Sequence, residues 1–413
     1  MVNAGGEPQT VQTACIDGVC VVKSTVKKDF YHHVREVDIM GNISNILVAP
    51  GRYVQGRGAI CELGRHIKNM GGSKALVVGG RRGLAATKEG RDKSFAEYGI
   101  QQVEELFCGE STQKELERLT KIFLDNGCDT VIGSGGGKVL DIVKCVGEEA
   151  GAKLTVTAPT VASNDSPTSA LGLIYSEDHV FERFYIPSKN PDIVIADSEI
   201  ISRAPVRTLV AGMGDALATW LEADACYRSH ALNFPGGHIT RTAIACARLC
   251  YDTLMRYGEE AKIANEMQVV TPALDAVIEA NVLLSGMGWE SGGLAAAHAM
   301  QDGFTSIPEI HDMLHGEKVG FLTLVQVILD DRPLEITKQV FEFAQKVGLP
   351  MTLEDLGCGN VSKEALMEAI RISCAPDESI HNLGSAITEE KVYDAVIAAD
   401  AIGRRMKNGE KVF

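Results

Sequence analysis

The segment between residues 45 and 205 alternates short apolar runs with longer amphipathic stretches, and this alternation constrains the fold more than any other feature. Continuous apolar runs are typical of strands that are buried on both faces of a parallel sheet. Amphipathic stretches between such strands predict helices that cover both faces. The sequence therefore predicts an α/β fold with a Rossmann-like parallel sheet. The expected strands are Ile46–Ala49, Lys74–Gly80, Val103–Phe107, Thr130–Gly133 and Leu154–Pro159.

Three helices are expected within this region, the last of them from Ile142 onward, after the three glycines described below. Ala59–Met70 carries apolar residues at helical spacing, and Ser111–Asn126 begins with Ser111 as the predicted N-cap. The proline and glycines of Pro50–Gly56 predict a turn between the first strand and the first helix.

The sequence changes character after Pro205, where Ala- and Leu-rich helical patterns replace the alternation. We therefore predict three parts: an N-terminal extension (1–44), a dinucleotide-binding α/β domain (45–205) and an all-helical domain (206–413). A cleft between two such domains is a common place for a ligand. The helices expected in the last part include Leu209–Ser229, Ile239–Tyr257 and Leu274–Gly286.

A run of three glycines joins a predicted strand to a predicted helix. Gly135, Gly136 and Gly137 precede Lys138, and glycines at this place let backbone N–H groups approach a pyrophosphate at the helix N-terminus. The run is not a P-loop, because Ile132 stands where that motif needs glycine and Val139 where it needs Ser or Thr. A tight turn without a ligand is the alternative interpretation.

Histidines in the helical part predict a metal site. His298 lies among very small side chains, and His315 follows after a loop broken by glycine and proline. Two imidazoles with a carboxylate suit zinc, which keeps one position open in catalytic sites. Two alternatives remain at this point: His298 is a hydrogen-bonded core residue, or His311 and His315 form an i,i+4 pair on one helix face. Asp215 follows Gly-Met-Gly and, taken alone, is interpreted as a helix cap.

Composition excludes several functional classes. The chain has 413 residues and a net charge of −15, which argues against binding to nucleic acids or anionic membranes. It contains no apolar run of about 18 residues, so no spanning helix is expected. Its 11 cysteines form no CxxC pair, and the first 28 residues fit neither a signal peptide nor a transit peptide. We expect a soluble cytoplasmic metabolic protein.

Several motifs, taken together, resemble the glycerol dehydrogenases of the iron- or zinc-dependent polyol dehydrogenase superfamily, over about Ile46 to Lys407. The motifs are GGGK, PTVASNDSPTSALGLIY, KNPDIVIAD, APVRTLVAGMGDALATW, GGLAAAHAMQDGF and HGEKVGF. The resemblance implies that Asp215, His298 and His315 hold the metal and leave one position open. The iron-dependent branch has a further histidine four residues after the aspartate. Thr219 stands there, which favours zinc.

The same resemblance implies a nicotinamide cofactor and a polyol substrate. Asp165 is expected beside the substrate hydroxyl, as a catalytic and substrate-binding residue. The implied cofactor-binding residues are Gly135, Gly136, Gly137, Lys138, Asp141, Thr160, Ser163, Ser169, Leu171 and Tyr175.

One departure from the family concerns the adenosine ribose. The family has an acidic residue after the first strand, whereas this chain has Gly80 followed by Arg81 and Arg82. Loss of the carboxylate and gain of cations is the usual change that admits a 2′-phosphate. The alternative is that both arginines are solvated loop residues. We expect NAD and also NADP as cofactors.

These features predict reversible NAD(P)-linked oxidation of glycerol, or a similar vicinal diol, to the hydroxyketone by a zinc-dependent homo-oligomer, with an octamer as the candidate size. Rival interpretations are a dehydroquinate-synthase-like lyase of the same fold, a dehydrogenase for another small alcohol, and a catalytically silent homologue. The lyase must bind a polyanion and needs clustered cations, whereas only Lys318 follows the histidine motif closely.

Overall fold

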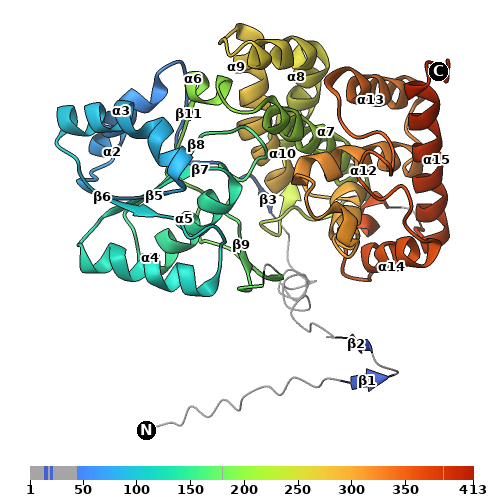
Figure 1. The fold of residues 1–413 in the computed structure, drawn as a ribbon, viewed down its shortest axis with the longest axis horizontal. Coiled ribbons are helices and arrows are strands. Elements are labelled where there is room, and N and C mark those ends of the chain that lie inside the picture. The colour runs from blue at the N-terminus through green and yellow to red at the C-terminus, as the bar shows by residue number, and fades with distance from the viewer. Residues whose placement is uncertain (1–13, 17–18, 22–43, 179, 385) are drawn as a thin grey trace. The chain divides into compact units, whose positions relative to one another are not determined.

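The computed structural model describes residues 14–16, 19–21, 44–178, 180–384 and 386–413. The chain forms two compact units, Met1–Met40 and Gly41–Phe413. Within the first unit, β1 (Ala14–Ile16) pairs antiparallel with β2 (Val19–Val21) (Figure 1). The other residues of the predicted extension, apart from Ser44, lie outside the described residues.

The second unit contains a six-stranded sheet of order β4-β11-β8-β7-β5-β6 in which all neighbours run parallel. This confirms the predicted Rossmann-like parallel sheet. The strands are β4 (Tyr53–Gly56), β5 (Lys74–Gly79), β6 (Gln101–Leu106), β7 (Thr130–Gly135), β8 (Leu154–Pro159) and β11 (Ile193–Asp197).

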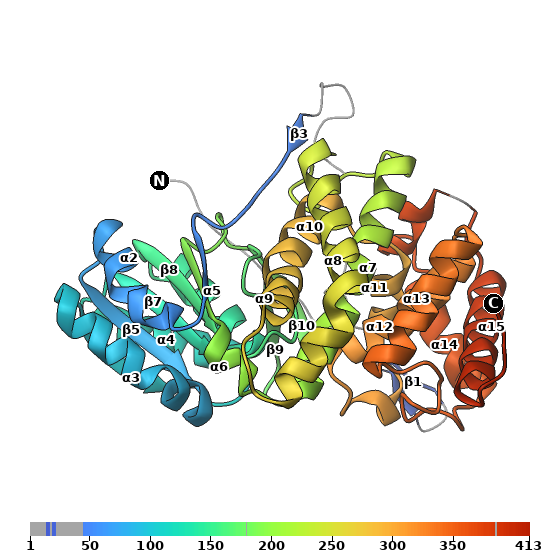
Figure 2. The ribbon, with the colours of Figure 1, turned by 90° about the horizontal axis from the view of Figure 1, so that it is seen from above.

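Helices cover both faces of this sheet (Figure 2). On one face, α2 (Leu63–Asn69) and α3 (Arg81–Tyr98) pack on side chains such as Val77 and Ile132. On the other face, α4 (Gln113–Asp125) and α5 (Gly137–Glu149) pack on Leu76, Val78 and Val131. Alternating strand residues thus supply two separate cores.

Four local predictions differ from the structure. Tyr53–Gly56, expected within a turn, is edge strand β4, and Ile46–Ala49 shrinks to β3 (Asn45–Ile46). The first predicted helix begins as a 3₁₀ turn over Ala59–Glu62. The N-cap of α4 is Thr112 rather than Ser111, because the Thr112 hydroxyl accepts a hydrogen bond from the Glu115 N–H.

A hairpin of β9 (Gly172–Tyr175) and β10 (Phe181–Tyr185) stands outside the large sheet and was not predicted. Its first strand bridges to Thr112 through Tyr175. The hairpin therefore connects the segment after β8 to the start of α4.

The remainder is helical, as predicted, apart from β12 (His238–Ile239), which pairs parallel with β3. The expected helix Leu274–Gly286 is instead α9, a π-helical turn over Ala280–Leu284 and the start of α10. None of the described helices is both long and apolar enough to cross a membrane. The α-helices are α6 (Ser198–Ser202), α7 (Val206–Ser229), α8 (Arg241–Glu266), α9 (Pro272–Glu279), α10 (Ser285–Gly292), α11 (Ala296–Phe304), α12 (His315–Leu329), α13 (Leu334–Val347), α14 (Lys363–Ser373) and α15 (Glu389–Lys407).

Candidate metal centre and nucleotide loop

Three side chains from three helices converge at one point. Asp215 lies on α7, His298 on α11 and His315 is the first residue of α12. Oδ1 of Asp215 is 3.5 Å from Nε2 of His298 and 3.2 Å from Nε2 of His315. One ligand atom from each residue lies within 4.8 Å of the others, and among the residues that the structure describes this is the one such group that could hold a metal ion.

Glycines at the crossing of α7 and α12 permit this approach. A Cβ atom on Gly316 would lie 1.8 Å from the Ala211 carbonyl oxygen, and one on Gly214 would lie 2.1 Å from the Gly316 carbonyl oxygen. These distances exclude any side chain, so the two backbones touch. Asp215 and His315, each next to one of these glycines, are brought together as a result.

Glu222 fixes the position of His298, one of the three candidate ligands. It is fully buried on α7, two helical turns beyond Asp215, and its Oε2 accepts a hydrogen bond from Nδ1 of His298 at 2.5 Å. Its Oε1 accepts from the N–H groups of Ala295 and His298, which caps the start of α11. With Nδ1 engaged, Nε2 of His298 faces Asp215. A carboxylate behind a ligating histidine is the usual outer-shell arrangement in metal sites.

The electrostatics of the group fit a cation. Burial by itself raises the pKa of Asp215, but the neighbouring His315 and His298 imidazoles hold that pKa below its ordinary value. Burial lowers the pKa of His298, yet Glu222 and Asp215 raise it above the ordinary value. Oδ1 of Asp215 is buried and has no hydrogen-bond partner among the described residues. A divalent cation would satisfy this oxygen and both Nε2 atoms, and the donor set is the one zinc prefers.

Asp165 lies next to the three candidate metal ligands. Its N–H donates to Oδ2 of Asp215 at 3.3 Å, and its Oδ2 accepts a hydrogen bond from the Ser285 hydroxyl at 2.6 Å. Burial, followed by the Asp215 carboxylate, raises the pKa of Asp165 well above its ordinary value. The loop approaches α7 closely because Gly212 has no side chain: a Cβ there would lie 1.9 Å from the Ala162 carbonyl oxygen.

The glycine run forms the expected strand-to-helix junction. β7 ends at Gly135, Gly136 is the N-cap and α5 begins at Gly137. Lys138 extends from this junction, and its ammonium pairs with Oε2 of Glu110 at 2.6 Å and lies 5.8 Å from the centre of the Tyr175 ring. The junction therefore has the geometry that a pyrophosphate uses, at the positive end of a 13-residue helix.

The other residues predicted to contact the cofactor differ in accessibility. Thr160, Ser163, Leu171 and Tyr175 are half-buried, whereas Ser169 is buried.

Asp141 is engaged elsewhere. Its Oδ1 accepts from the Ser166 hydroxyl at 2.6 Å and lies 3.0 Å from the buried Lys144 ammonium. Lys144 also donates to the Ser166 carbonyl. The structure thus supports a role for Asp141 in anchoring the Asp165 loop more than in binding a cofactor.

His311 does not join the metal group. It follows a short 3₁₀ turn before α12, and its Nε2 lies 3.0 Å from the Thr305 carbonyl oxygen. The i,i+4 helical pair with His315 is therefore absent from the described helices, since α12 begins only at His315.

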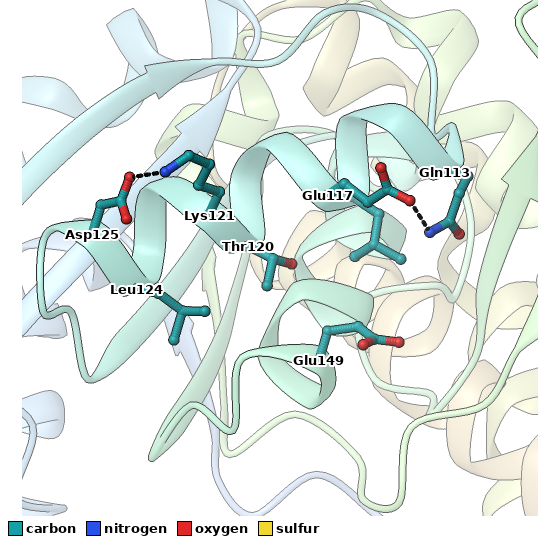
Figure 3. Close-up of a pocket in the computed structure, with 8 residues that line it drawn as sticks. Gln113, Glu117, Thr120, Lys121, Leu124, Asp125 and Glu149 are labelled. Carbon is teal, nitrogen blue, oxygen red and sulfur yellow. Dashed lines mark hydrogen bonds and ion pairs between the residues drawn. The ribbon is translucent and has the colours of Figure 1, made fainter.

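A surface groove of about 290 Å³ lies between α4 and Glu149 at the end of α5 and is not the candidate site (Figure 3). Its charged side chains all have partners, since Lys121 pairs with Asp125, Glu117 accepts from Gln113 and Glu149 accepts from Tyr185. None of its lining residues belongs to the metal group or to the glycine run.

Known proteins resemble this chain over most of its length. A family model described as iron-containing alcohol dehydrogenase matches residues 50–198. A glycerol dehydrogenase from Escherichia coli O6:H1 is 43% identical over 88% of this chain and 98% of its own length. The chain belongs to the iron-containing alcohol dehydrogenase family. The resemblance found in the motifs is confirmed.

Other members of this family extend the comparison. The crystal structure of glycerol dehydrogenase from Schizosaccharomyces pombe has a TM-score of 0.85 and 37% identity, covering 90% of this chain and 94% of that one. A glycolaldehyde reductase from Halobacterium salinarum is 41% identical over 89% of this chain and its full length. The shared fold thus extends well beyond the 50–198 segment.

Two polar residues of the site were not predicted from the sequence. Glu222 carries a detectable signal, because it lies seven residues after Asp215 within a predicted helix and so shares its face. Ser285 carries none, because its direction depends on the π-helical turn that precedes it.

Proposed function

We propose that this family member is a metal-dependent NAD(P)-linked oxidoreductase that interconverts glycerol, or a similar vicinal diol, and dihydroxyacetone. The observation that carries the proposal is the convergence of Asp215, His298 and His315 on one point with Asp165 beside it. Family members named glycerol dehydrogenase, at 37% to 44% identity, support this substrate class.

The residues have distinct roles in this proposal. Zinc, when held by Asp215, His298 and His315, supplies a Lewis acid that lowers the pKa of a substrate hydroxyl. Asp165 accepts a hydrogen bond from the neighbouring hydroxyl and so orients the diol. Glu222 keeps His298 in the tautomer that leaves Nε2 unprotonated. Bound NAD(P)⁺ would supply the hydride acceptor, so the alcohol would be oxidised as the nucleotide is reduced, with the hydroxyl proton released to solvent.

Zinc is favoured over iron by the residue at position 219. Thr219 occupies the place of the fourth ligand of the iron-dependent branch, and its hydroxyl lies 2.8 Å from the Ser285 hydroxyl. A Cβ on Gly288 would lie 2.4 Å from the Thr219 methyl group. The methyl therefore packs tightly, and no fourth protein ligand comes from α7. Metal analysis of the purified protein tests this choice.

The nucleotide is proposed to bind along β7 and α5. Gly135, Gly136 and Gly137 provide backbone N–H groups, and Lys138 provides a charge for the diphosphate. NADP is proposed as a second cofactor, because Arg81 and Arg82 are exposed at the N-terminus of α3 and no carboxylate occupies position 80.

We further infer a cytoplasmic homo-oligomer whose α/β and helical domains meet near residue 205. The family resemblance supports this arrangement, and analytical ultracentrifugation measures the oligomer size. A lyase is not favoured, because the relatives that this chain matches over nearly their whole length include glycerol dehydrogenases and a glycolaldehyde reductase.

A substrate panel tests the proposed function. Glycerol, glycolaldehyde, 1-propanol and dihydroxyacetone would be assayed with NAD(H) and NADP(H), before and after chelation and with zinc restored. We expect zinc-dependent nucleotide reduction with glycerol. Turnover of glycolaldehyde without any turnover of glycerol or dihydroxyacetone would assign the substrate of the Halobacterium relative instead.

A further inference from the structure

Asp165 is held by a short chain of buried hydroxyl groups that ends on α7. The Ser285 hydroxyl donates to Oδ2 of Asp165 at 2.6 Å, and the Thr219 hydroxyl lies 2.8 Å from the Ser285 hydroxyl. Thr219 and Ser285 are 1% and 0% exposed. When Asp165 is ionised, Ser285 gives its one proton to the carboxylate, so Thr219 donates to Ser285. The direction of both hydrogen bonds is thereby fixed.

The π-helical turn before α10 places Ser285 in this chain. Within Ala280–Leu284 the i→i−4 pattern is interrupted, and the Val282 carbonyl accepts from the Thr168 hydroxyl at 3.0 Å. The same hydroxyl lies 3.2 Å from the Asp165 carbonyl oxygen. The π turn and the residue after it thus reach Asp165 at two places: Val282 reaches the Asp165 backbone through the Thr168 hydroxyl, and Ser285 contacts the Asp165 carboxylate. Such turns are frequent at functional sites.

The chain of hydroxyl groups leaves the second carboxylate oxygen of Asp165 available to a ligand. Oδ2 is engaged by Ser285, whereas Oδ1 accepts no hydrogen bond from a described residue, and Asp165 as a whole is only half-buried. With Oδ2 anchored, rotation of the carboxylate is restricted and Oδ1 keeps one direction. This is the arrangement needed to accept a hydrogen bond from a single substrate hydroxyl at a set distance from the metal residues.

We propose that Ser285 and Thr219 are positioning residues that orient the Asp165 carboxylate and so set the preference for vicinal diols over mono-alcohols. The inference rests on the proposed function, because it assigns Oδ1 of Asp165 to the second hydroxyl of the diol. In this family member, Thr219 supplies a hydroxyl that acts on Asp165 through Ser285. The iron-dependent branch has a metal ligand at the same position.

The experiment compares Ser285→Ala and Thr219→Val with matched controls. Ser291→Ala removes an equally buried hydroxyl from the same helix, one that contacts Val48 and not Asp165. Thr323→Val removes a buried hydroxyl that donates to the Val319 carbonyl on α12. We expect kcat/KM for glycerol to fall about tenfold or more in S285A, and less in T219V, with 1-propanol changed less than about threefold. Both controls should keep the wild-type ratio of kcat/KM for glycerol to kcat/KM for 1-propanol. Thr219→Ser, which keeps the hydroxyl that T219V removes, should also keep this ratio.

A double-mutant cycle tests whether Ser285 acts through Asp165. If it does, S285A should cost nothing further in an Asp165→Asn background. Additive losses, or an unchanged diol preference in S285A that retains its zinc and its melting temperature, would overturn the proposal.

Crystal structures of the wild type and S285A give a readout that needs no substrate. We expect the Asp165 carboxylate to rotate or to become disordered in S285A, and an unmoved carboxylate would overturn the positioning role. If the wild type fails to oxidise glycerol, the proposed function fails. The carboxylate orientation still decides whether Ser285 holds Asp165.

Discussion

Glu222 accepts a hydrogen bond from Nδ1 of His298 at 2.5 Å, from a position two helical turns beyond Asp215 on the same face of α7. One helix thus supplies both a proposed metal ligand and the carboxylate that orients another ligand. Because Glu222 also caps the first turn of α11, the position of His298 is determined twice, through its ring and through its backbone. The fold therefore pre-organises the candidate metal ligands.

The first prediction concerns this carboxylate. Glu222→Gln keeps the size of the side chain and an oxygen for the backbone N–H groups, but removes the charge behind His298. We expect zinc affinity to fall about tenfold to a hundredfold, the usual cost of losing such a partner. Competition with a chromophoric chelator measures it. Glu260→Gln on the exposed face of α8 is the control. Equal zinc affinity in E222Q and E260Q would contradict the role.

The second prediction separates the metal residues from their neighbour. His298→Ala and His315→Ala should each abolish activity and zinc retention, because each removes one of three convergent ligands. His311→Ala should retain zinc, since its ring contacts only the Thr305 carbonyl. Metal content per chain after dialysis is the measurement. Loss of zinc in H311A together with retention in H298A would show that the metal binds elsewhere.

The sequence predicted three of the four inner strands, β5, β7 and β8, because burial on both faces gives continuous apolar runs. It did not predict the fourth, β11, although all five of its residues are buried. It missed β4, whose four half-buried residues follow Pro50 and Gly51 at the sheet edge. The β9–β10 hairpin was missed because polar residues such as Glu182 and Arg183 interrupt its pattern. Edge and hairpin strands are determined by their partners, which no local pattern reveals.

The site was predicted less evenly. The spacing of the residues did not decide whether His298, His311 or Asp215 binds a metal. Only the family resemblance selected His298 and Asp215 over His311. The physical reason lies in tertiary packing: Gly214 and Gly316 bring two helices into backbone contact, and neither glycine reveals its partner in the sequence. Ser285 could not be predicted, because a π-helical turn rotates it relative to a regular helix.

The third prediction concerns pH and the buried Glu290. It accepts hydrogen bonds from the Ala170 N–H and from Asn190, but burial raises its pKa to about 7. The folded state therefore binds this proton more tightly than the unfolded state does. The resulting stabilisation is present in full below the unfolded pKa, about 4.5, and is lost as pH rises to about 7. Its upper limit is on the order of 3 kcal/mol.

Glu290→Gln removes the titration and isolates this effect. The free energy of unfolding of E290Q should vary less between pH 4.5 and 7 than that of the wild type, whatever its absolute value. Denaturant titrations at several pH values measure the difference, and E260Q again serves as the control. Parallel wild-type and E290Q curves would show that Glu290 keeps an ordinary pKa.

The last prediction concerns cofactor choice. Gly80 is the N-cap of α3 with φ −70 and ψ 161, and a Cβ there would meet no atom within 4 Å. Gly80→Asp is therefore tolerated, and its carboxylate would accept hydrogen bonds from the ribose hydroxyls and repel a 2′-phosphate. Arg81 and Arg82 are exposed, and exposed charge pairs contribute about 1 kcal/mol or less, which is under tenfold in affinity. The wild type should thus use both cofactors with at most a modest preference for NADP, and G80D should prefer NAD.

The measurement is kcat/KM for both cofactors, with Gly80→Asn as the uncharged control. A wild type that prefers NAD by more than about a hundredfold, roughly 2.7 kcal/mol, would show that neither arginine faces the ribose.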